Sequence, residues 1–462
     1  MPALSFVLPH IQPWHGLALL HIAAVATGLL SYIVLTHSGR QQRPPTAAIA
    51  WVIALVAFPY LALPVFLLFG TRKLAHVAQV HAASANADLH LAITRGLDLP
   101  PPRPCASIRL QVDGEAALHE LLALLGQARR KIEIEIFLFR DDPVGERVAA
   151  ALSDAARRGV EVRVLLDGLG TFIGRRQSLH LLRNAGAQVR WFSPLRLRLR
   201  PRFGRGNLRN HRKLVLVDDH TLWSGGRNLA EEYFLGTDKS PAWQDLGFII
   251  EGGIVTDAAA CFARDWAMAG GGHSSPAAAP AHAIGPLAQL LPSGPDHRGD
   301  TAHALYLQAI HRADARVWAA TPYFVPDDAL QQALLLAAQR GVEVCLLLPA
   351  RSNHRMADIA RERSLRELVA AGARIHQSPA MLHAKLLLVD DAFASCGSIN
   401  LDGRSLFLNY ELNTLFFDSA QIDALADWFT AQCARSSRHD PRPPGWWRDI
   451  GEGLVRAVGF QL

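Results

Sequence analysis

Two stretches of the chain, Asn210-His-Arg-Lys-Leu-Val-Leu-Val-Asp218 and Leu382-His-Ala-Lys-Leu-Leu-Leu-Val-Asp390, decide how the rest of the sequence is interpreted. Each places a histidine and a lysine two residues apart, ahead of an apolar, β-rich run and an aspartate. A turn of small residues and an asparagine follow at matching offsets, Asn228 in the first copy and Asn400 in the second. One such motif would be a weak signal. Two copies indicate a duplicated unit.

The duplication extends upstream of both motifs. The segment Ala156-Arg-Arg-Gly-Val-Glu-Val-Arg-Val-Leu-Leu166 matches Ala338-Gln-Arg-Gly-Val-Glu-Val-Cys-Leu-Leu-Leu348. In each copy a helical pattern ends at Arg-Gly, as a glycine cap ends a helix, and a β-rich run follows. Upstream, the alternating residues 131–137 have a counterpart in 316–321. Strands that alternate with helices predict an α/β fold, with βαβ units and a mostly parallel sheet in each half.

The repeated residue types are those that phosphoryl transfer through a covalent histidine requires. One imidazole attacks phosphorus while the other handles the proton, and cationic and amide groups hold the phosphate oxygens. The groups expected to bind those oxygens are Lys213, Lys385, Asn228 and Asn400. Because side chains at i and i+2 of a strand share a face, His211 and His383 are each expected beside the lysine of their own motif. The pattern therefore predicts an enzyme that acts on a phosphodiester.

The carboxylates near the motifs divide into two kinds. Asp218 and Asp390 lie seven positions past their histidines, with opposite parity, so we expect them to be structural partners of a neighbouring turn or basic group. A catalytic histidine works best when another group fixes its tautomer. Asp245 and Glu411, at comparable distances downstream, are the candidates for that role. The sequence does not assign either carboxylate to a particular ring.

The N-terminal part of the chain is apolar. Residues 16–36 and 47–69 each match the roughly 20 residues needed to cross a bilayer. A short loop with Arg40 and Arg43 separates them, so residues 1–75 are predicted to form a two-helix transmembrane hairpin, favoured over a signal peptide or buried core helices. Pro59 and Pro64 are expected to kink the second span. Basic residues after that span favour a cytoplasmic location for the catalytic region.

Composition narrows the class of partner. The 462 residues carry a net charge of +6, which suits an anionic partner such as lipid headgroups or nucleic acid. The five cysteines are odd in number, scattered and never spaced as C-x-x-C. That spacing predicts neither a disulfide framework nor a zinc site, and it favours a reducing compartment. The histidines show no HExxH-like spacing either.

The remaining boundaries follow from changes in composition. We expect a linker at 76–106 that includes a proline-rich stiff spacer, a first domain at 107–270, a linker at 271–285 and a second domain at 286–435. The basic insertion 195–205 is either a charged edge segment or a rim that draws anionic headgroups. The tail 436–462 is either an interfacial helix, with its two tryptophans at headgroup level, or a helix docked on the soluble part.

The paired motifs resemble the HKD signature of the phospholipase D superfamily. Together with the hairpin, residues 207–213, 243–245 and 400–405 resemble the bacterial cardiolipin synthases of that superfamily, over nearly the whole chain. The resemblance implies two phospholipase D-like sandwich halves related by a pseudo-two-fold axis, with both histidines in a shared cleft. It also implies a catalytic set that consists of His211, Lys213, Asp218, His383, Lys385 and Asp390.

The implied reaction joins two phosphatidylglycerol molecules into cardiolipin and releases glycerol. By the resemblance, His211 attacks the first lipid and His383 protonates the departing glycerol, although the pseudo-symmetry allows the two roles to be exchanged. No metal ion or other cofactor is implied, because cationic side chains supply the charge stabilisation. The expected setting is the bacterial inner membrane, in contact with anionic lipids. A homo-oligomer is possible but is not required, because one chain carries both histidines.

Four other functions fit parts of the pattern. Water as acceptor would make the protein a phospholipase D, and another alcohol would make a different phospholipid. A nuclease would also use paired HKD motifs, but the apolar runs argue against nucleic acid, as does the lack of aromatic residues interleaved in the basic stretch. A membrane scaffold with a decayed site is disfavoured because neither motif lacks a residue.

Overall fold

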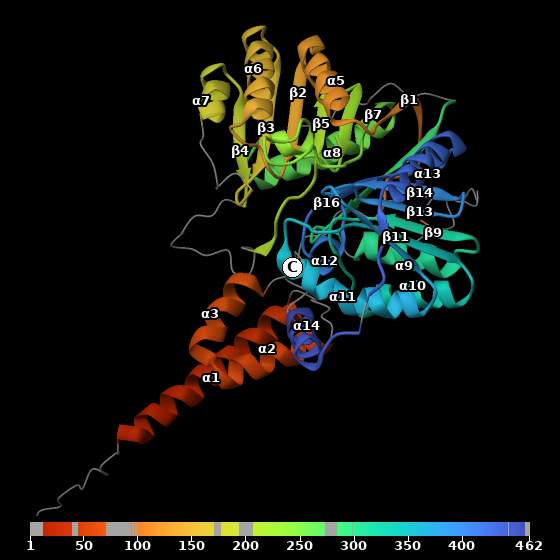
Figure 1. The fold of residues 1–462 in the computed structure, drawn as a ribbon. Helices are drawn as coiled ribbons and strands as arrows, with labels where there is room; N and C mark the ends of the chain where they lie inside the picture. The colour runs from red at the N-terminus through yellow and green to blue at the C-terminus, as the bar shows by residue number, and fades with distance from the viewer. Residues whose placement is uncertain are drawn as a thin grey trace, which may run out of the picture. The chain divides into compact units, whose positions relative to one another are not determined.

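The computed structural model describes residues 13–38, 45–70, 94, 97, 99–170, 177–193, 207–272, 284–297, 299–441 and 443–457 (Figure 1). The chain divides into two compact units, one comprising residues 1–77 and 197–207 and the other 78–196 and 208–462. The basic insertion expected at 195–205 lies outside the described residues.

The first unit is built from the helices α1 (Pro13–Ser38), α2 (Pro45–Ala57) and α3 (Pro59–Phe69). Phe66 joins them, because its ring lies 5.4 Å from that of Tyr32 on α1 and 5.1 Å from that of Trp51 on α2. Gly28 allows close approach, since a Cβ added there would lie 3.1 Å from Leu55. The helices thus pack by interlocking small and aromatic residues, as helices in a bilayer do.

The second apolar run does not form one continuous helix. It breaks at Phe58, whose φ of −136° is outside the helical range, and Pro59 begins α3. Proline removes a helical hydrogen bond and clashes with the preceding turn, so the break follows from its chemistry. Among the described residues, α1 alone is long and apolar enough to cross a membrane, over 16–36. Two full spans therefore remain a prediction.

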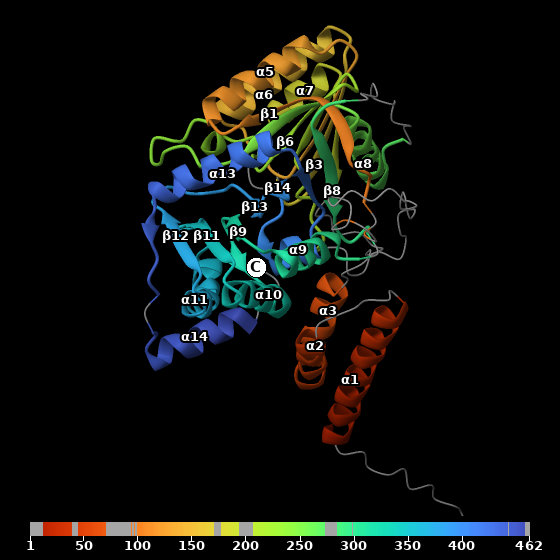
Figure 2. The same ribbon diagram turned by 90° about the vertical axis from the view of Figure 1, so that its right-hand side faces the viewer.

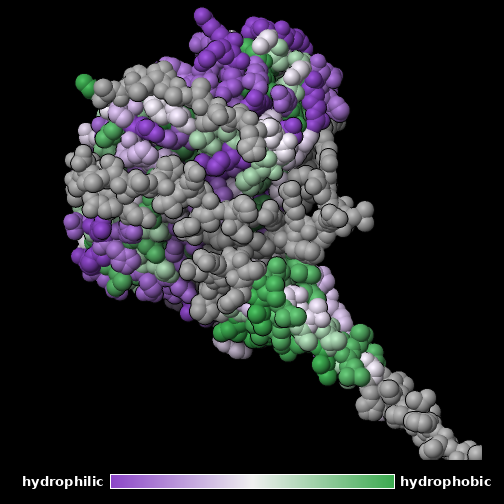
Figure 3. All heavy atoms as spheres, turned by 180° about the vertical axis from the view of Figure 1, so that it is seen from behind, coloured by the Kyte–Doolittle hydropathy of each residue, from purple (hydrophilic) through white to green (hydrophobic). Residues whose placement is uncertain are grey.

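The outer surface of these helices is hydrophobic. Trp14 is 72 % exposed and Leu61 70 %, and further Leu, Ile and Val side chains of α1–α3 are also exposed. Figure 3 shows this as a continuous patch of apolar side chains. Apolar patches of such extent indicate contact with lipid or protein.

The second unit confirms the duplication through its sheet topology. Among the described residues, fifteen strands form one sheet in which the same strand order occurs twice. In the first half the order is β1 (Arg103–Gln111), β7 (Gly247–Gly252), β6 (Thr221–Gly225), β5 (Leu214–Val217), β2 (Lys131–Ile136), β3 (Glu161–Asp167) and β4 (Gln188–Phe192). In the second half it is β8 (Leu287–Ser293), β16 (Glu411–Phe416), β14 (Phe393–Gly397), β13 (Leu386–Val389), β9 (Arg316–Ala320), β11 (Glu343–Pro349) and β12 (Arg374–Ser378). The edge strand β17 (Ser437–Arg438) completes the second half.

The halves meet where β1 pairs with β8, through Arg103 opposite Ala288 and Pro104 opposite Leu287. Strand β1 therefore begins inside the segment that we expected to be a linker up to residue 106. The proline-rich spacer ends in a strand because its last residues find backbone partners on the other half of the sheet.

The expected parallel character of each sheet is only partly correct. Strands β2, β3 and β4 are parallel, and so are β9, β11 and β12. The strands that follow each HKD motif are antiparallel to their neighbours. The reason lies in the connections. The short turn between β5 and β6 reverses the chain, whereas parallel pairing requires a long crossover.

Helices cover both faces of each half (Figure 2). The first half carries α5 (Gly114–Gln127), α6 (Pro143–Arg157), α7 (Gln177–Asn184) and α8 (Ile254–Met268). The second carries α9 (Thr301–Arg312), α10 (Asp328–Gln339), α11 (Arg355–Ala370) and α13 (Ser419–Ala434). Short elements complete the fold: η2 (Glu231–Tyr233), β10 (Phe324–Val325), β15 (Leu401–Asp402) and α12 (Gly403–Phe407). Helices α6 and α10 begin alike, because Asp142 and Asp327 each accept hydrogen bonds from backbone N–H groups of the first turn.

The C-terminal tail contains α14 (Trp446–Ala457), which docks on α11. Arg366 lies 2.6 Å from Glu452, and Arg448 also contacts that carboxylate. Trp446 and Trp447 are 69 % and 77 % exposed. The described part of α14 therefore packs against α11. Contact of the tryptophans with a membrane stays a prediction.

The aspartates of the two motifs are positioned as loop-holding residues. The Asp218 carboxylate accepts hydrogen bonds from the backbone N–H groups of Arg129, Arg130 and Lys131, at 2.9, 2.7 and 2.9 Å. Asp390 does the same for residues 314–316, at 2.8–3.0 Å. Both aspartates have a positive φ, 54° and 49°. Each one fixes the turn that leads into β2 or β9, the strand that pairs with the strand of its own motif.

Replacing Asp218 with alanine should lower the free energy of unfolding by roughly 1–3 kcal/mol, because three backbone donors lose a charged acceptor. Asp218→Asn should lose less, since asparagine keeps an acceptor oxygen and tolerates the positive φ. Urea denaturation of the three proteins measures the difference. Equal stability of the alanine variant and the wild type would contradict the role assigned to Asp218.

Candidate active site

The two halves exchange short backbone segments at their interface. The N–H of His211 in the first half donates to the carbonyl of Tyr410 in the second, at 2.8 Å. Reciprocally, the N–H of His383 donates to the carbonyl of Gln244, at 2.7 Å, and the N–H of Gln244 donates to Met381, at 2.9 Å. Each histidine is thus bound through its own backbone to the opposite half.

This exchange assigns the two carboxylates crosswise. Glu411 follows Tyr410, and its Oε1 lies 3.2 Å from Nδ1 of His211. Asp245 follows Gln244, and its Oδ2 lies 2.7 Å from Nδ1 of His383. Each half therefore supplies the carboxylate that orients the imidazole of the other half. Because Nδ1 faces the carboxylate in both cases, Nε2 is the ring nitrogen left for chemistry.

The lysines are buried beside the histidines. Lys213 Nζ donates to the carbonyl of His211 at 2.8 Å. Lys385 Nζ lies 2.9 Å from Nδ1 and 3.0 Å from Nε2 of His383. The expectation that these residues lie within the strand is wrong, since β5 and β13 begin one residue after each lysine. The histidine segments leave the ladder because they pair with the other half instead.

Electrostatics favour neutral imidazoles in this site. Burial, then Lys213, lowers the pKa of His211 to about 4, and burial, then Lys385, lowers that of His383 to about 3. Each lysine also lowers the pKa of the other half's histidine, which indicates one shared site. Burial raises the pKa of the Asp245 carboxyl, but the nearby His383 and Lys385 lower it by more. The pKa of Asp245 therefore lies below its usual value. A neutral imidazole beside an ionised carboxylate is the form that can act as a nucleophile or base.

Burial also depresses the pKa of the cationic groups, to about 8 for Lys213 and about 7 for Lys385. Nearby carboxylates oppose this effect, but they do not cancel it. An ammonium group held in such surroundings gains a large favourable interaction when an anion enters. The arrangement can therefore hold an anion between two cationic donors, as the predicted phosphate-binding role requires.

The asparagines at matched offsets are buried and oriented by their own halves. Asn228 Nδ2 donates to the hydroxyl of Tyr233 at 2.9 Å, and Asn400 Nδ2 donates to the hydroxyl of Ser405 at 3.1 Å. The partner lies five residues downstream in both copies. Each amide thus commits one N–H to its own half and is held in a fixed orientation.

Aromatic side chains surround the imidazoles, and the sequence analysis missed them as site residues. Tyr233 stands edge-on to His383, with ring centroids 4.9 Å apart, and Trp243 lies 5.5 Å from the same ring. Phe137 stands edge-on to His211 at 4.8 Å. The sequence could have pointed to Tyr233, because it follows Asn228 by five residues, as Ser405 follows Asn400. These rings hold the imidazoles and limit the access of water.

Arg212 is a second residue that the sequence analysis missed. It is fully buried between the halves, where it forms an ion pair with Asp265 and lies 3.2 Å from Asp296. Its Nε donates to the carbonyl of Glu411 at 3.2 Å. The second copy has Ala384 at the matching position. The sequence could have pointed to Arg212 through this difference between the two copies. Arg212 holds the segment that carries Glu411 against His211.

The structure therefore brings together His211, His383, their lysines and the two downstream carboxylates. It leaves Asp218 and Asp390 at the far ends of β5 and β13, where they hold backbone and do not contact the imidazoles among the described residues. The resemblance had counted both as members of the catalytic signature. Among the described residues, the cluster with metal-ligand spacing lies elsewhere, at Cys345, His376 and Cys433.

Comparison with known proteins identifies the family of the chain. The family model "Cardiolipin synthase, PLD-like domain" matches residues 121–266 and 306–433. Cardiolipin synthase A of Pseudomonas entomophila is 32 % identical over 93 % of this chain and 96 % of its own length. Cardiolipin synthase A of Pseudomonas aeruginosa PAO1 is 32 % identical over 95 % of each chain. The crystal structure of a Haemophilus influenzae phosphatidylserine synthase, 13 % identical, shares the fold with a TM-score of 0.62 over 81 % of this chain and 99 % of its own.

The site should bind sulfate, whose charge is constant near neutral pH, more weakly as the pH rises through 7 and then 8. The lysine pKa values are depressed in the free site, and a bound anion raises them, so binding takes up protons in that range. Each lysine that deprotonates should reduce the apparent affinity by up to about tenfold per pH unit. Calorimetric titration in buffers of different ionisation enthalpy measures both effects.

Lys385→Met should remove the step near pH 7, while Lys239→Met, at an exposed position, should leave the profile unchanged. An affinity that does not vary across this pH range would show that the lysines do not hold the anion.

Proposed function

The chain belongs to the cardiolipin synthase family of phospholipase D-like proteins, and on this premise we propose that it transfers a phosphatidyl group from one phosphatidylglycerol to another. The products are cardiolipin and glycerol. The observation that carries the proposal is the crosswise pairing of two buried imidazoles with two carboxylates, beside two buried lysines. This arrangement can perform two displacements at one phosphorus atom without releasing the phosphatidyl group.

In the first step, Nε2 of His211 attacks the phosphorus of the first lipid. A P–N bond forms, the P–O bond to glycerol breaks, and His383 gives its proton to the departing oxygen. The side chain of His211 is 15 % exposed and that of His383 is 5 %, which supports His211 as the attacking group. The entering phosphodiester offsets the lysine charges and raises the pKa of His383, so that ring is protonated when the glycerol leaves.

In the second step, His383 takes the proton from a hydroxyl group of the second phosphatidylglycerol. The resulting oxygen attacks phosphorus, the P–N bond breaks and His211 is restored. Lys213, Lys385, Asn228 and Asn400 hold the phosphoryl oxygens through both steps and stabilise the charge that accumulates on them. Glu411 and Asp245 keep the two rings in the tautomer that presents Nε2.

The acceptor is proposed to be a lipid hydroxyl and not water. The rings of Phe137, Tyr233 and Trp243 lie within 5.5 Å of the imidazoles, measured between centroids. Apolar walls of this kind disfavour water at the phosphohistidine, so an amphipathic alcohol is the favoured acceptor. Hydrolysis to phosphatidic acid remains the alternative reaction of the same site.

The setting proposed is the bacterial inner membrane, with α1 and the second apolar segment as the anchor and the catalytic unit on the cytoplasmic side. The exposed apolar surface of α1 supports the anchor. Each of the five cysteines lies in the described part of the chain and is a free thiol, which supports a reducing compartment.

Purified protein incubated with phosphatidylglycerol alone should form cardiolipin and glycerol in equal amounts, measured by lipid chromatography and an enzymatic glycerol assay. His211→Asn should lower the turnover by at least roughly 10³-fold, because no phosphohistidine can form. The matched control is His220→Asn, at an exposed position on a turn, which should keep wild-type turnover.

If phosphatidic acid forms and cardiolipin does not, the protein is a hydrolase and not a synthase. A separate measurement tests which histidine is the nucleophile and which is the acid. The His383→Asn variant should retain an acid-labile, lipid-derived label on the protein, whereas the His211→Asn variant should not. The reverse result would exchange nucleophile and acid.

Asp245→Asn should lower kcat roughly 10²–10⁴-fold with little change in KM, because the amide favours the wrong tautomer of His383 while the shape of the site is kept. Glu411→Gln should act in the same way on His211. Asp154→Asn, which removes only an exposed ion pair on α6, serves as the control. A loss of less than about threefold for both site variants would show that the crossed carboxylates do not orient the rings.

A further inference from the structure

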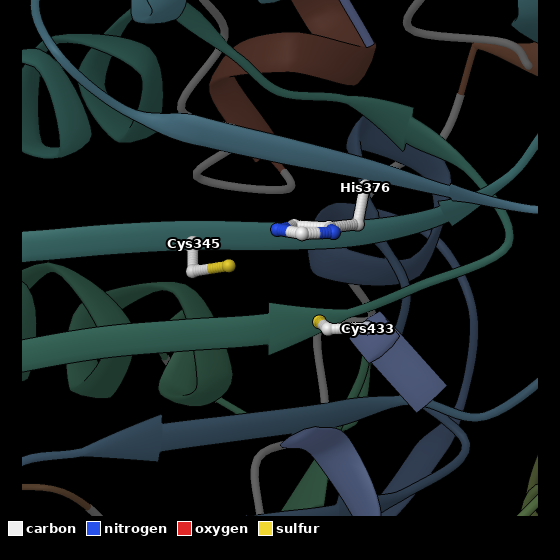
Figure 4. Close-up of side chains that lie close together, drawn as sticks. All are labelled: Cys345, His376 and Cys433. Atoms are coloured by element: carbon white, nitrogen blue, oxygen red, sulfur yellow. The ribbon is translucent and has the colours of Figure 1, made fainter. Parts of the chain in front are cut away.

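A second cluster of reactive side chains lies in the second half of the sheet and takes no part in the proposed reaction. It consists of Cys345 on β11, His376 on β12 and Cys433 near the end of α13 (Figure 4). The two sulfur atoms and the ring nitrogen lie within 4.8 Å of one another. Figure 4 shows the two thiols and the imidazole edge directed into the same space.

The fold presents these three residues from rigid elements. On the parallel pair β11–β12, Cys345 lies opposite Arg374, so His376, two residues further on, projects from the same face. Helix α13 covers that face. Its Phe429 stacks on Trp318, the residue opposite Cys345 on β9, with ring centroids 5.2 Å apart and an interplanar angle of 16°. The stack holds the helix in register with the strands and keeps Cys433 over the cluster.

The chemistry of the cluster is that of a soft metal site. Both cysteines are free thiols. Nδ1 of His376 is buried without a hydrogen-bond partner among the described residues, while the ring forms a hydrogen bond with the backbone of Cys433. Tetrahedral zinc with thiolate and imidazole ligands brings its donor atoms to within about 3.8 Å of one another. Small side-chain rotations reach that spacing from 4.8 Å.

We propose that Cys345, His376 and Cys433 bind one thiophilic divalent cation of the zinc class, with a water molecule as fourth ligand. Two thiolates and one neutral imidazole balance the charge of a divalent ion, which suits a partly buried position. Carboxylate-binding ions such as Mg²⁺ and Ca²⁺ are disfavoured, because the three ligands include no oxygen.

Metal binding here would fasten the C-terminal part of the chain to the sheet. Cys433 lies at the end of α13, directly before β17, and β17 pairs with β12 through Arg438 opposite His376. A cation held by Cys433 and His376 would therefore tie the end of α13 to β12, at the position where β12 pairs with β17. The role is structural, since the cluster stabilises the segment that leads to α14.

Sequence spacing does not reveal this site. The three ligands come from two strands and a helix that are distant along the chain, and no pair of them has the short spacing of a zinc motif. The sequence analysis accordingly predicted no zinc site among the cysteines, and only the register of β11 against β12 and the packing of α13 place the ligands together.

Cobalt(II) is the probe, because its spectrum reports the ligands directly. Reduced full-length protein titrated with Co²⁺ in detergent should develop thiolate-to-cobalt charge-transfer bands and the strong visible bands of a tetrahedral ion, saturating at a single ion per chain. Zn²⁺ should displace the cobalt and raise the Tm of the wild type. Cys345→Ser and Cys433→Ser should each lose the charge-transfer intensity and the rise in Tm, and His376→Asn should weaken cobalt binding at least tenfold.

Cys105→Ser is the matched control, because it also removes a buried thiol but lies on β1, outside the cluster. It should keep the complete cobalt spectrum. The site would be rejected if reduced wild-type protein showed no thiolate–cobalt bands, or if the bands persisted in both cysteine variants. A Cys345–Cys433 disulfide found by peptide mapping, with no cobalt uptake after reduction, would also overturn it. None of these readouts depends on lipid turnover, so they test the site independently of the proposed function.

Discussion

The active site depends on two backbone hydrogen bonds that cross between the halves, from His211 to Tyr410 and from His383 to Gln244. They remove both histidines from the strands of their own halves and set each beside a carboxylate of the other. A duplicated fold alone would leave two separate, incomplete sites. The exchange makes one site, because neither half can orient its own imidazole. Arg212, buried on the same interface, ties the Glu411 segment into this arrangement.

The charge balance of the site follows from its burial. Lysines taken out of water lose part of their preference for the charged form, and the imidazoles beside them stay neutral. Two ionised carboxylates limit how far the pKa values of the lysines fall. A phosphodiester brings the negative charge that this cluster lacks, so the substrate improves the solvation of the lysines when it binds. The site is thus suited to an anion, whose binding would raise the pKa values of the buried lysines and of His383.

The HKD signature combines residues of two physical kinds. The histidine and lysine lie where the halves meet, whereas Asp218 and Asp390 accept hydrogen bonds from backbone N–H groups at the opposite ends of β5 and β13. These aspartates hold the turns before β2 and β9, the strands against which β5 and β13 pair. The motif therefore contains both a reactive group and the loop-holding group that keeps its strand in register.

The sequence by itself determined the features that depend on local pattern: the α/β duplication, the apolar N-terminal helix, the paired His/Lys/Asn sets and the turn-holding role of the two aspartates. Only the tertiary structure decided which carboxylate serves which ring, because Asp245 and Glu411 reach their partners across an interface that no spacing encodes. It likewise decided the mixed character of the sheet, the helix break at Phe58 and the meeting of Cys345, His376 and Cys433. Periodicity reports the neighbours of a residue along one element, whereas these features depend on which elements pack together.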